Sequence, residues 1–324
     1  MAAAVSVIMP FHNSESTIER AIASLDAQEC DEETEFVLVN DGSTDCSVEI
    51  VEYYAAKHPE FGRRLRFVSY SFRQGAAAAF AQGMKHAGGE YLARLDSDDA
   101  YAAGALQALL RKAREDNADI VVSDVFIESP GRKPRVCRLD ERKLELNRMP
   151  LTTVYFCLWN KLIRRKLIEE NGIAPVSGID CWEDVSVSAR AFAVAGKVSH
   201  LPEPLYHYSV NQVKGSLSRS HRDIVLRQRL MCALLVEKWF DERNLVDRYA
   251  PFLNLMKFNA KIKLLRSSDR DIVKWKETFP EVNGAIMSLK QMPLYLRVAF
   301  WLVDRLPVPL ADSCCKIAES LKIK

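Results

Sequence analysis

The first hundred residues alternate between short apolar segments and segments with apolar side chains at helical spacing. The short apolar runs predict buried strands, and the helical spacing predicts amphipathic helices between them. The expected strands and helices, in chain order, are residues 4–9, 14–28, 36–39, 45–56, 65–70, 75–86 and 91–95. Such an alternation requires a parallel sheet with right-handed crossovers, and ligands collect at the carboxyl edge of such a sheet. The sequence therefore predicts an α/β fold.

Three carboxylates, Asp96, Asp98 and Asp99, follow directly after the predicted strand 91–95. Clustered acids repel one another, and their pKa values rise unless a cation or hydrogen-bond donors compensate. A divalent metal ion would supply that compensation, and an acidic turn capping the next helix is the alternative. Asp41 follows another strand, so the same sheet edge could hold a nucleotide and its metal ion.

The 324 residues are enough for one larger domain and an appendage. We expect a domain over residues 1–220 and a basic helical region over residues 221–324, because helical periodicity dominates from His221 onward. Up to Ser220 there are 31 acidic and 26 basic residues, whereas 19 basic and 12 acidic residues follow it. The basic residues form no concentrated run, so nucleic acid is not expected as a partner.

The eight cysteines are scattered without a C-x-x-C pair, which predicts neither a zinc site nor a disulfide framework. The N-terminus leads almost directly into a strand, without the pattern of a secretory signal. The apolar stretch 292–303 is shorter than the ~20 residues that a spanning helix needs. We therefore expect a cytoplasmic protein. Neither G-x-G-x-x-G after the first strand nor G-x-x-x-x-G-K-[ST] occurs, which argues against dinucleotide-binding and P-loop proteins.

Six segments, taken in order, resemble the inverting glycosyltransferases of family 2. The segments are VSVIMPFHNSE (5–15), VLVNDGSTD (37–45), GGEYLARLDSDD (88–99), WNKLIRR (159–165), WEDVSVSAR (182–190) and LYHYSVNQVKGSLS (205–218). The resemblance implies the GT-A fold of nucleotide-diphospho-sugar transferases, a mostly parallel twisted sheet flanked by helices, here with a C-terminal helical extension. It also implies transfer of a sugar from a nucleoside-diphosphate donor, expected to carry UDP, to a hydroxyl of a glycan or lipid-linked acceptor, as in bacterial polysaccharide biosynthesis.

The resemblance assigns the nucleoside side of the donor site to three segments. Pro10, Asn13 and Glu15 would shape the nucleoside pocket, and Asp96 would lie near the ribose. Asp41 would accept a hydrogen bond from the base edge, since a carboxylate is an acceptor only. Taken alone, Asp41 fits a turn or helix cap equally well.

A metal site is implied at the end of the fourth strand. Asp98 would bind Mn²⁺ or Mg²⁺ on the diphosphate with support from Asp99, and His207 would complete the shell. The ion would neutralise charge on the departing diphosphate. A hydrogen-bonded histidine between Tyr206 and Tyr208 is the structural alternative for His207.

Asp184 is the implied general base, with Glu183 as its neighbour. Asp184 would take the proton from the acceptor hydroxyl as that oxygen attacks the anomeric carbon. At a helix start the dipole would keep the carboxylate ionised but lower its basicity, so its position would matter more than a raised pKa. The alternative is that both acids only place negative charge in the first turn of the helix, where it is favourable.

The acceptor side and a covering loop complete the implied site. Trp159, Asn160 and Lys161 resemble a segment beside the acceptor, although a tryptophan that packs against a helix is the commoner case. Lys214 and Ser216 stand where the family has a loop over the diphosphate, whose closure would exclude water.

One departure from the family bears on activity. The family carries Asn in place of Arg73 and an Arg-Asn pair in place of Phe80 and Ala81, and that arginine helps to hold the nucleotide. Arg73 is a candidate replacement. The alternative function is a catalytically impaired nucleotide-sugar-binding protein, and a sugar-phosphate nucleotidyltransferase ranks last because its Gly-rich loop is missing.

The basic tail suggests peripheral contact with the inner face of the cell membrane. Residues 294–303 are apolar or aromatic except for Arg297. Further positive charge follows at Arg305, Lys316, Lys322 and Lys324. These helices could equally pack on the catalytic domain or on a second subunit in a homodimer.

Overall fold

The computed structural model describes residues 3–28, 34–210, 222–265 and 270–320. The chain divides into two compact units, one formed by residues 1–141 and 156–214 and the other by residues 142–155 and 215–324. Residues 142–155 thus belong to the second unit, although they lie within the range predicted for the first domain. The side chain of Asn147 donates to the main-chain oxygen of Arg248, and its own main-chain oxygen accepts from Gln291.

The first unit begins with the predicted parallel strands. They are β1 (Val5–Phe11), β2 (Thr34–Asp41), β3 (Leu65–Tyr70) and β4 (Tyr91–Arg94). β1 pairs with β2 and β4, and β2 pairs with β3, all in parallel. Pro10 does not end β1, which continues to Phe11, because β4 pairs with β1 only as far as Ile8 and the missing amide hydrogen is not needed there.

The sheet continues on the other side of β4 with mixed directions. Its further strands are β5 (Ala100–Tyr101), β6 (Ile120–Glu128), β7 (Arg135–Cys137), β8 (Lys161–Arg164) and β9 (Val198–Ser209). Across the described residues the order is β3-β2-β1-β4-β8-β6-β9-β5, with β7 paired to β6. β8 is antiparallel to both β4 and β6, whereas β6 and β9 are parallel. The predicted α/β sheet flanked by helices is confirmed.

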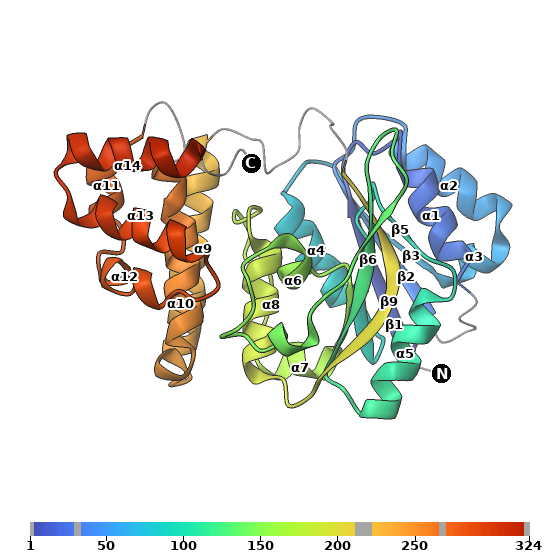
Figure 1. Cartoon of the computed structure of the whole chain (residues 1–324). Coiled ribbons are helices and arrows are strands. Elements are labelled where there is room, and N and C mark those ends of the chain that lie inside the picture. The colour runs from blue at the N-terminus through green and yellow to red at the C-terminus, as the bar shows by residue number, and fades with distance from the viewer. Residues whose placement is uncertain (1–2, 29–33, 211–221, 266–269, 321–324) are drawn as a thin grey trace. The chain divides into compact units, whose positions relative to one another are not determined.

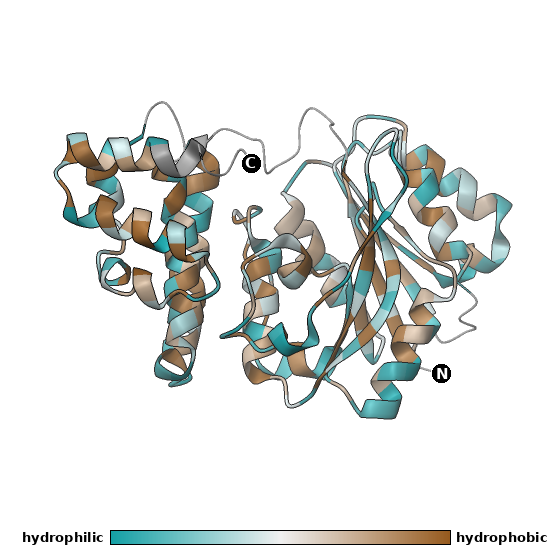
Figure 2. Cartoon of the chain, viewed as in Figure 1, coloured by the Kyte–Doolittle hydropathy of each residue, from teal (hydrophilic) through white to brown (hydrophobic). Residues whose placement is uncertain are grey.

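Helices cover both faces of this sheet. They are α1 (Ile18–Asp26), α2 (Ser47–Lys57), α3 (Pro59–Arg64), α4 (Ala76–His86), α5 (Ala105–Asp116), α7 (Arg165–Glu170) and α8 (Glu183–Val194). Figure 1 shows α1, α2 and α5 on one face and α4, α7 and α8 on the other. The alanine-rich α4 packs closely on β1, since a Cβ on Gly83 would lie 2.3 Å from Cγ2 of Ile8. Figure 2 shows hydrophobic residues along the strands and in bands on these helices.

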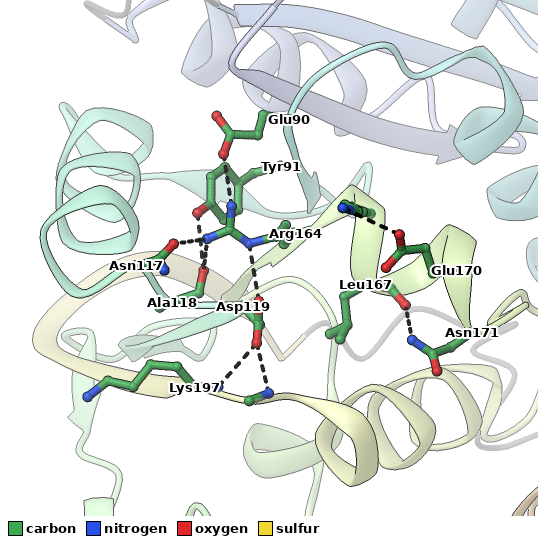
Figure 3. A network of polar contacts seen from close by, with 12 residues as sticks. Glu90, Tyr91, Asn117, Ala118, Asp119, Arg164, Leu167, Glu170, Asn171 and Lys197 are labelled. Atoms are coloured by element: carbon green, nitrogen blue, oxygen red, sulfur yellow. Dashed lines mark hydrogen bonds and ion pairs between the residues drawn. The ribbon is translucent and has the colours of Figure 1, made fainter. Parts of the chain in front are cut away.

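Arg164 joins several elements at the amino end of β4, opposite the carboxyl edge (Figure 3). Its guanidinium lies 4.9 Å from the ring centroid of Tyr91 and pairs with Glu90 at 3.0 Å and Asp119 at 3.2 Å. Asp119 also accepts from the amides of Gly196 and Lys197. Arg164 therefore connects β4, β8 and the turn before β9 through one planar, multiply donating group.

The second unit is helical. Two short elements, η1 (Glu141–Lys143) and α6 (Thr153–Phe156), lie where the chain passes between the two units. The others are α9 (Arg222–Asp241), α10 (Val246–Lys261), η3 (Ile262–Leu265), α11 (Ile272–Glu277), α12 (Glu281–Gly284), η4 (Ile286–Ser288), α13 (Leu294–Arg305) and α14 (Val308–Ser320). Phe258, Trp275 and Phe300 form the aromatic centre of its core. Among the described residues, every helix is too short or too polar to cross a membrane.

Candidate active site

The loops after β1 and β2 brace each other at the carboxyl edge of the sheet. Asn13 has a φ of 48°, and its side-chain oxygen accepts from the amide of Thr44 at 2.8 Å. Glu15 accepts from the amide of Cys46 at 3.1 Å, and its own amide donates to Asp45 at 3.0 Å. The residues assigned to the nucleoside pocket therefore lie together, with Pro10 in the strand below them. Their contact with a nucleoside stays a prediction.

Asp41 ends β2 and is buried beneath the start of α4. Its two carboxylate oxygens accept from the amides of Gln74 at 2.6 Å and Gly75 at 2.9 Å. A carboxylate is favourable there because the amide groups of a helix N-terminus carry positive partial charge. Asp41 thus fixes the turn that leads into α4. Each carboxylate oxygen has a second lone pair, so the predicted bond to a base stays a prediction.

A second carboxylate reaches the same helix end from a distant part of the sequence. Asp180, in the loop before α8, accepts from the amide of Ala77 at 3.0 Å. Gly75 has a φ of 102°, and a Cβ at this position would lie 2.6 Å from Oδ1 of Asp180. The sequence pattern did not reveal Asp180, which stands only four residues before Asp184 but belongs to no recognisable motif.

The loop between β3 and α4 presents Arg73 to solvent. A Cβ on Gly42, whose φ is 64°, would lie 2.6 Å from the amide nitrogen of Arg73. The turn after β2 therefore presses on this loop and fixes its main chain. The side chain of Arg73 is exposed next to the amides that bind Asp41.

The three clustered aspartates have different surroundings. Asp98 is exposed and Asp96 is half-buried, whereas Asp99 is only 2% exposed. Asp99 accepts from the hydroxyl of Tyr206 at 2.9 Å and from the amide of Ser209 at 2.7 Å. Burial, and then the charges of Asp96 and Asp98, raise the pKa of Asp99 to about 9. Asp99 therefore holds β9 against the end of β4.

Asp98 is the one member of this cluster whose side chain is exposed enough to reach a divalent ion. In the described part of the chain, no three His, Cys, Asp or Glu side chains are placed to hold a metal ion by themselves. An exposed carboxylate nevertheless suits Mg²⁺ or Mn²⁺, since Mg²⁺ keeps several waters and takes substrate phosphate oxygens as ligands. Asp99 faces Tyr206, and Nδ1 of His207 lies 2.8 Å from Glu128. Their contacts suit support of the site better than direct ligation.

Arg94, the last residue of β4, is a buried cation that the sequence pattern did not single out. Its Nε donates to Asp96 at 2.7 Å and its Nη1 donates to Glu183 at 3.0 Å. The guanidinium lies 4.9 Å from the ring centroid of Phe80 on α4. Arg94 therefore connects β4, α4 and α8. An arginine inside an otherwise apolar strand is the signal by which it could have been found.

Glu183 and Asp184 form the first turn of α8, after Trp182 in the left-handed conformation. Burial raises the pKa of Glu183 to about 7, although Arg94 opposes this rise. Burial also raises the pKa of Asp184, against the opposing charge of Arg94. The expectation that Asp184 would rely on its position rather than on a raised pKa is therefore wrong, because desolvation raises its pKa more than the opposing interactions lower it.

The segment predicted beside the acceptor lies under the site. Trp159 is 4% exposed, and its ring stacks on Tyr206 at 4.6 Å and on Tyr208 at 5.1 Å. Lys161 is buried and donates to the main-chain oxygen of Cys157 at 2.6 Å and to Asn160 at 2.8 Å. These three predicted residues form a packed floor.

Two predicted residues, Lys214 and Ser216, lie outside the described residues. Nine of the other predicted residues form two groups along the carboxyl edge. Asn13, Glu15, Asp41 and Arg73 lie around the ends of β1 and β2. Asp96, Asp98, Asp99, Glu183 and Asp184 lie around the end of β4 and the start of α8.

Relatives of this chain have been named for sugar transfer. "Uncharacterized glycosyltransferase EpsJ" of Bacillus subtilis is 32% identical over 64% of this chain and 61% of its own length. "Cholesterol galactosyltransferase" of Borreliella burgdorferi is 33% identical over 67% of this chain and 62% of its own length. The chain thus matches about three fifths of the length of these relatives.

The fold also resembles solved structures. Staphylococcus aureus TarS 1–349 in complex with UDP-GlcNAc has a TM-score of 0.71 and 20% sequence identity, over 98% of this chain and 91% of that chain. Residues 6–172, more than half of the chain, match the family described as "Glycosyl transferase family 2". This match confirms the resemblance found in the sequence, and the chain belongs to glycosyl transferase family 2.

Proposed function

We propose that the protein transfers a sugar from a UDP-sugar to a hydroxyl of a glycan or lipid-linked acceptor, with inversion at the anomeric carbon. The observation that carries this proposal is the grouping of Asp96, Asp98, Glu183 and Asp184 beside the Asp41 loop at one sheet edge. TarS, whose fold this chain shares, has been solved in complex with UDP-GlcNAc. One relative is named a poly(ribitol-phosphate) beta-glucosyltransferase, which is consistent with a polymeric acceptor.

On the donor side, the braced loops after β1 and β2 would hold the nucleoside. Asp41 is fixed by two amides and would use its remaining lone pairs on the base. Asp96 would contact the ribose. The exposed guanidinium of Arg73 would pair with a phosphate, since a planar fork suits phosphate oxygens. Lys214 and Ser216 would follow as parts of the covering loop.

Asp98 would hold Mn²⁺ or Mg²⁺ against the diphosphate, with Asp99 and His207 in support. The ion, when bound, supplies positive charge to the departing diphosphate. This chain's contribution is a single exposed carboxylate beside the buried pair of Asp99 and Tyr206.

Asp184 would act as the general base. Its carboxylate would accept the acceptor's hydroxyl proton while that oxygen bonds to the anomeric carbon and the bond to the diphosphate breaks on the opposite face. Burial raises the pKa of Asp184, which makes it a stronger base than an exposed aspartate. Glu183 is engaged by Arg94 and would position Asp184. Trp159, with Asn160 and Lys161 below it, would form the floor of the acceptor site.

Thermal-shift screening of UDP-sugars with and without Mn²⁺ tests donor binding directly. A ligand present at 100 times its Kd stabilises the folded state by about 2.7 kcal/mol. We expect a rise in Tm for one UDP-sugar that is larger with Mn²⁺, followed by Mn²⁺-dependent donor hydrolysis or transfer. Binding without any turnover would instead favour the impaired nucleotide-sugar-binding protein, the alternative suggested by Phe80.

We also propose that α13 brings the protein to the inner face of the cell membrane. Leu294, Tyr295 and Val298 are exposed on one side of this helix, and Arg305 lies 4.2 Å from the ring of Trp301 further along it. Apolar and aromatic side chains next to cations suit the interface of an anionic bilayer, and the region after residue 220 has a net charge of +7.

Sedimentation with anionic liposomes at low salt tests this contact. The variant Val298→Glu should sediment less than the unmodified protein, whereas Tyr53→Glu, at an exposed apolar position in the first unit, should sediment equally. Absence of sedimentation would overturn the membrane proposal. A change from dimer to monomer in Val298→Glu, measured by light scattering, would assign this face to a homodimer.

A further inference from the structure

The carboxylates of the candidate site are joined through one side chain. Arg94 donates from Nε to Asp96 and from Nη1 to Glu183, and its guanidinium carbon lies over the ring of Phe80. Asp96 belongs to the donor side of the site, and Glu183 precedes the candidate base. Arg94 is only 8% exposed, so water does not screen these pairs as it would at the surface.

We propose that Arg94 is a positioning residue, which fixes the start of α8 relative to the end of β4 and so sets the place of Asp184 above the donor. The proposal rests on the proposed sugar transfer. Arg94 touches neither donor nor acceptor in this account and acts through Asp96 and Glu183.

The chemistry of the contacts favours geometry over stability as their purpose. A buried ion pair is weak evidence for stability, because the loss of hydration offsets most of the attraction. Two donors on different edges of one planar group define a direction as well as a distance. Lysine has one point charge without a plane, so Arg94→Lys keeps the charge but cannot keep the arrangement.

The same contacts influence the ionisation of the base. The charged groups that face Glu183 and Asp184 are Arg94 and Asp96 at the end of β4 and Lys161 on β8, besides the two acids themselves. Arg94 favours the ionised form of both acids. Its loss leaves the negative charges facing one another, so the pH at which the base ionises should rise.

The chain contains a matched control at the other end of β4. Arg164 also lies 4.9 Å from an aromatic ring, that of Tyr91, and pairs with two carboxylates. It lies at the amino edge, away from the candidate site. Arg164→Lys therefore removes the same kind of planar contact without touching α8.

The experiment compares Arg94→Lys and Arg164→Lys with the unmodified protein. We expect Arg94→Lys to bind the UDP-sugar within about 3-fold of the unmodified affinity but to lose about 100-fold in kcat, the size of effect that a small misplacement of reacting groups produces. The acidic limb of the pH profile should stay in place in Arg94→Lys, which keeps the positive charge, and should move to higher pH in Arg94→Phe, which removes it. Arg164→Lys should keep kcat and the pH profile, even if its Tm falls.

Hydrogen exchange at the amides of residues 183–187 gives a reading that does not need turnover. Arg94→Lys should lower protection there at unchanged global stability, and Arg164→Lys should not. Unchanged protection and unchanged kcat in Arg94→Lys would overturn the positioning role. Lower protection in a protein that transfers no sugar would instead retain the link between β4 and α8 and reject the proposed function.

The double variant Phe80→Arg/Arg94→Phe, in which the two side chains are swapped, tests whether a loss of kcat comes from misfolding. The guanidinium carbon of Arg94 lies over the ring of Phe80, and the exchange conserves the summed volume and charge of the two side chains. We expect it to recover at least 10-fold of the kcat lost in Arg94→Phe alone. A double variant that folds, with unchanged Tm, but is no more active than Arg94→Phe would contradict the proposal.

Discussion

Asp41 and Asp180 bind the same turn of α4 from two segments that are far apart in the sequence. Asp41 accepts from the amides of Gln74 and Gly75, and Asp180 accepts from the amide of Ala77. One carboxylate follows β2 and the other lies in the loop that leads to α8. The start of α4 thus connects the nucleoside side of the site to the segment that carries the candidate base.

Replacing these two carboxylates should separate folding from binding. Asp41→Ala leaves two amides without partners and should lower the free energy of unfolding by about 1–3 kcal/mol. It should also abolish the Tm shift produced by a UDP-sugar. Asp180→Ala should lose about as much stability and keep that shift. Urea unfolding and thermal-shift titration measure both effects, and equal loss of binding in the two variants would remove Asp41 from base recognition.

Asp184→Asn should leave donor binding intact and nearly abolish transfer. The amide cannot accept a proton at neutral pH, and a positioned base contributes about 10²- to 10⁴-fold to the rate. Donor affinity from titration calorimetry and kcat from product release give the two quantities. Turnover close to that of the unmodified protein would exclude Asp184 as the base.

Glu183 should make stability depend on pH. Its pKa in the folded protein is raised from 4.5 to about 7, so the folded state disfavours its ionised form. Its favourable contribution is therefore complete below about pH 4.5 and is lost as the pH rises through 7. Relative to the unmodified protein, Glu183→Gln should gain about 2–3 kcal/mol between pH 4.5 and pH 8. Urea unfolding at both pH values measures this; a difference that does not change with pH would contradict it.

Lys261 should stabilise the second unit. This buried side chain donates to the main-chain oxygens of Trp275, Thr278 and Phe279 and to Asn283. Lys261→Met leaves these acceptors unsatisfied and should cost about 2–4 kcal/mol in the free energy of unfolding. The exposed Lys290→Met is the control and should change it by less than about 0.5 kcal/mol. UDP-sugar binding should survive in both variants.

The local pattern was sufficient to predict the parallel half of the sheet. The strand 65–70 has the predicted bounds, and the strand predicted over 91–95 ends one residue earlier. The mixed half of the sheet was harder to predict, because its strand pairings join distant segments. β8 is a four-residue strand inside a stretch that showed only general apolar periodicity. β9 runs from Val198 to Ser209 although Pro202 and Pro204 interrupt its alternation, and a register shift against β6 accommodates them.

In the candidate site, too, some features could be predicted from the sequence and others could not. Acids at strand ends were visible because carboxyl ends of parallel strands share one edge. The role of Arg94 was not visible in the sequence, because its partner Glu183 is 89 residues away and only the folded chain brings them together. The stacking of Trp159 on Tyr206 and Tyr208 was likewise hidden, because both tyrosines come from the distant β9.

The most direct test is a crystal structure of the protein with a non-hydrolysable UDP-sugar and Mn²⁺. We predict the uracil beside Asp41, the diphosphate and Mn²⁺ at Asp98, and the anomeric carbon open toward Asp184. A nucleotide bound away from the carboxyl ends of β1, β2 and β4, or a sugar turned away from Asp184, would contradict this account.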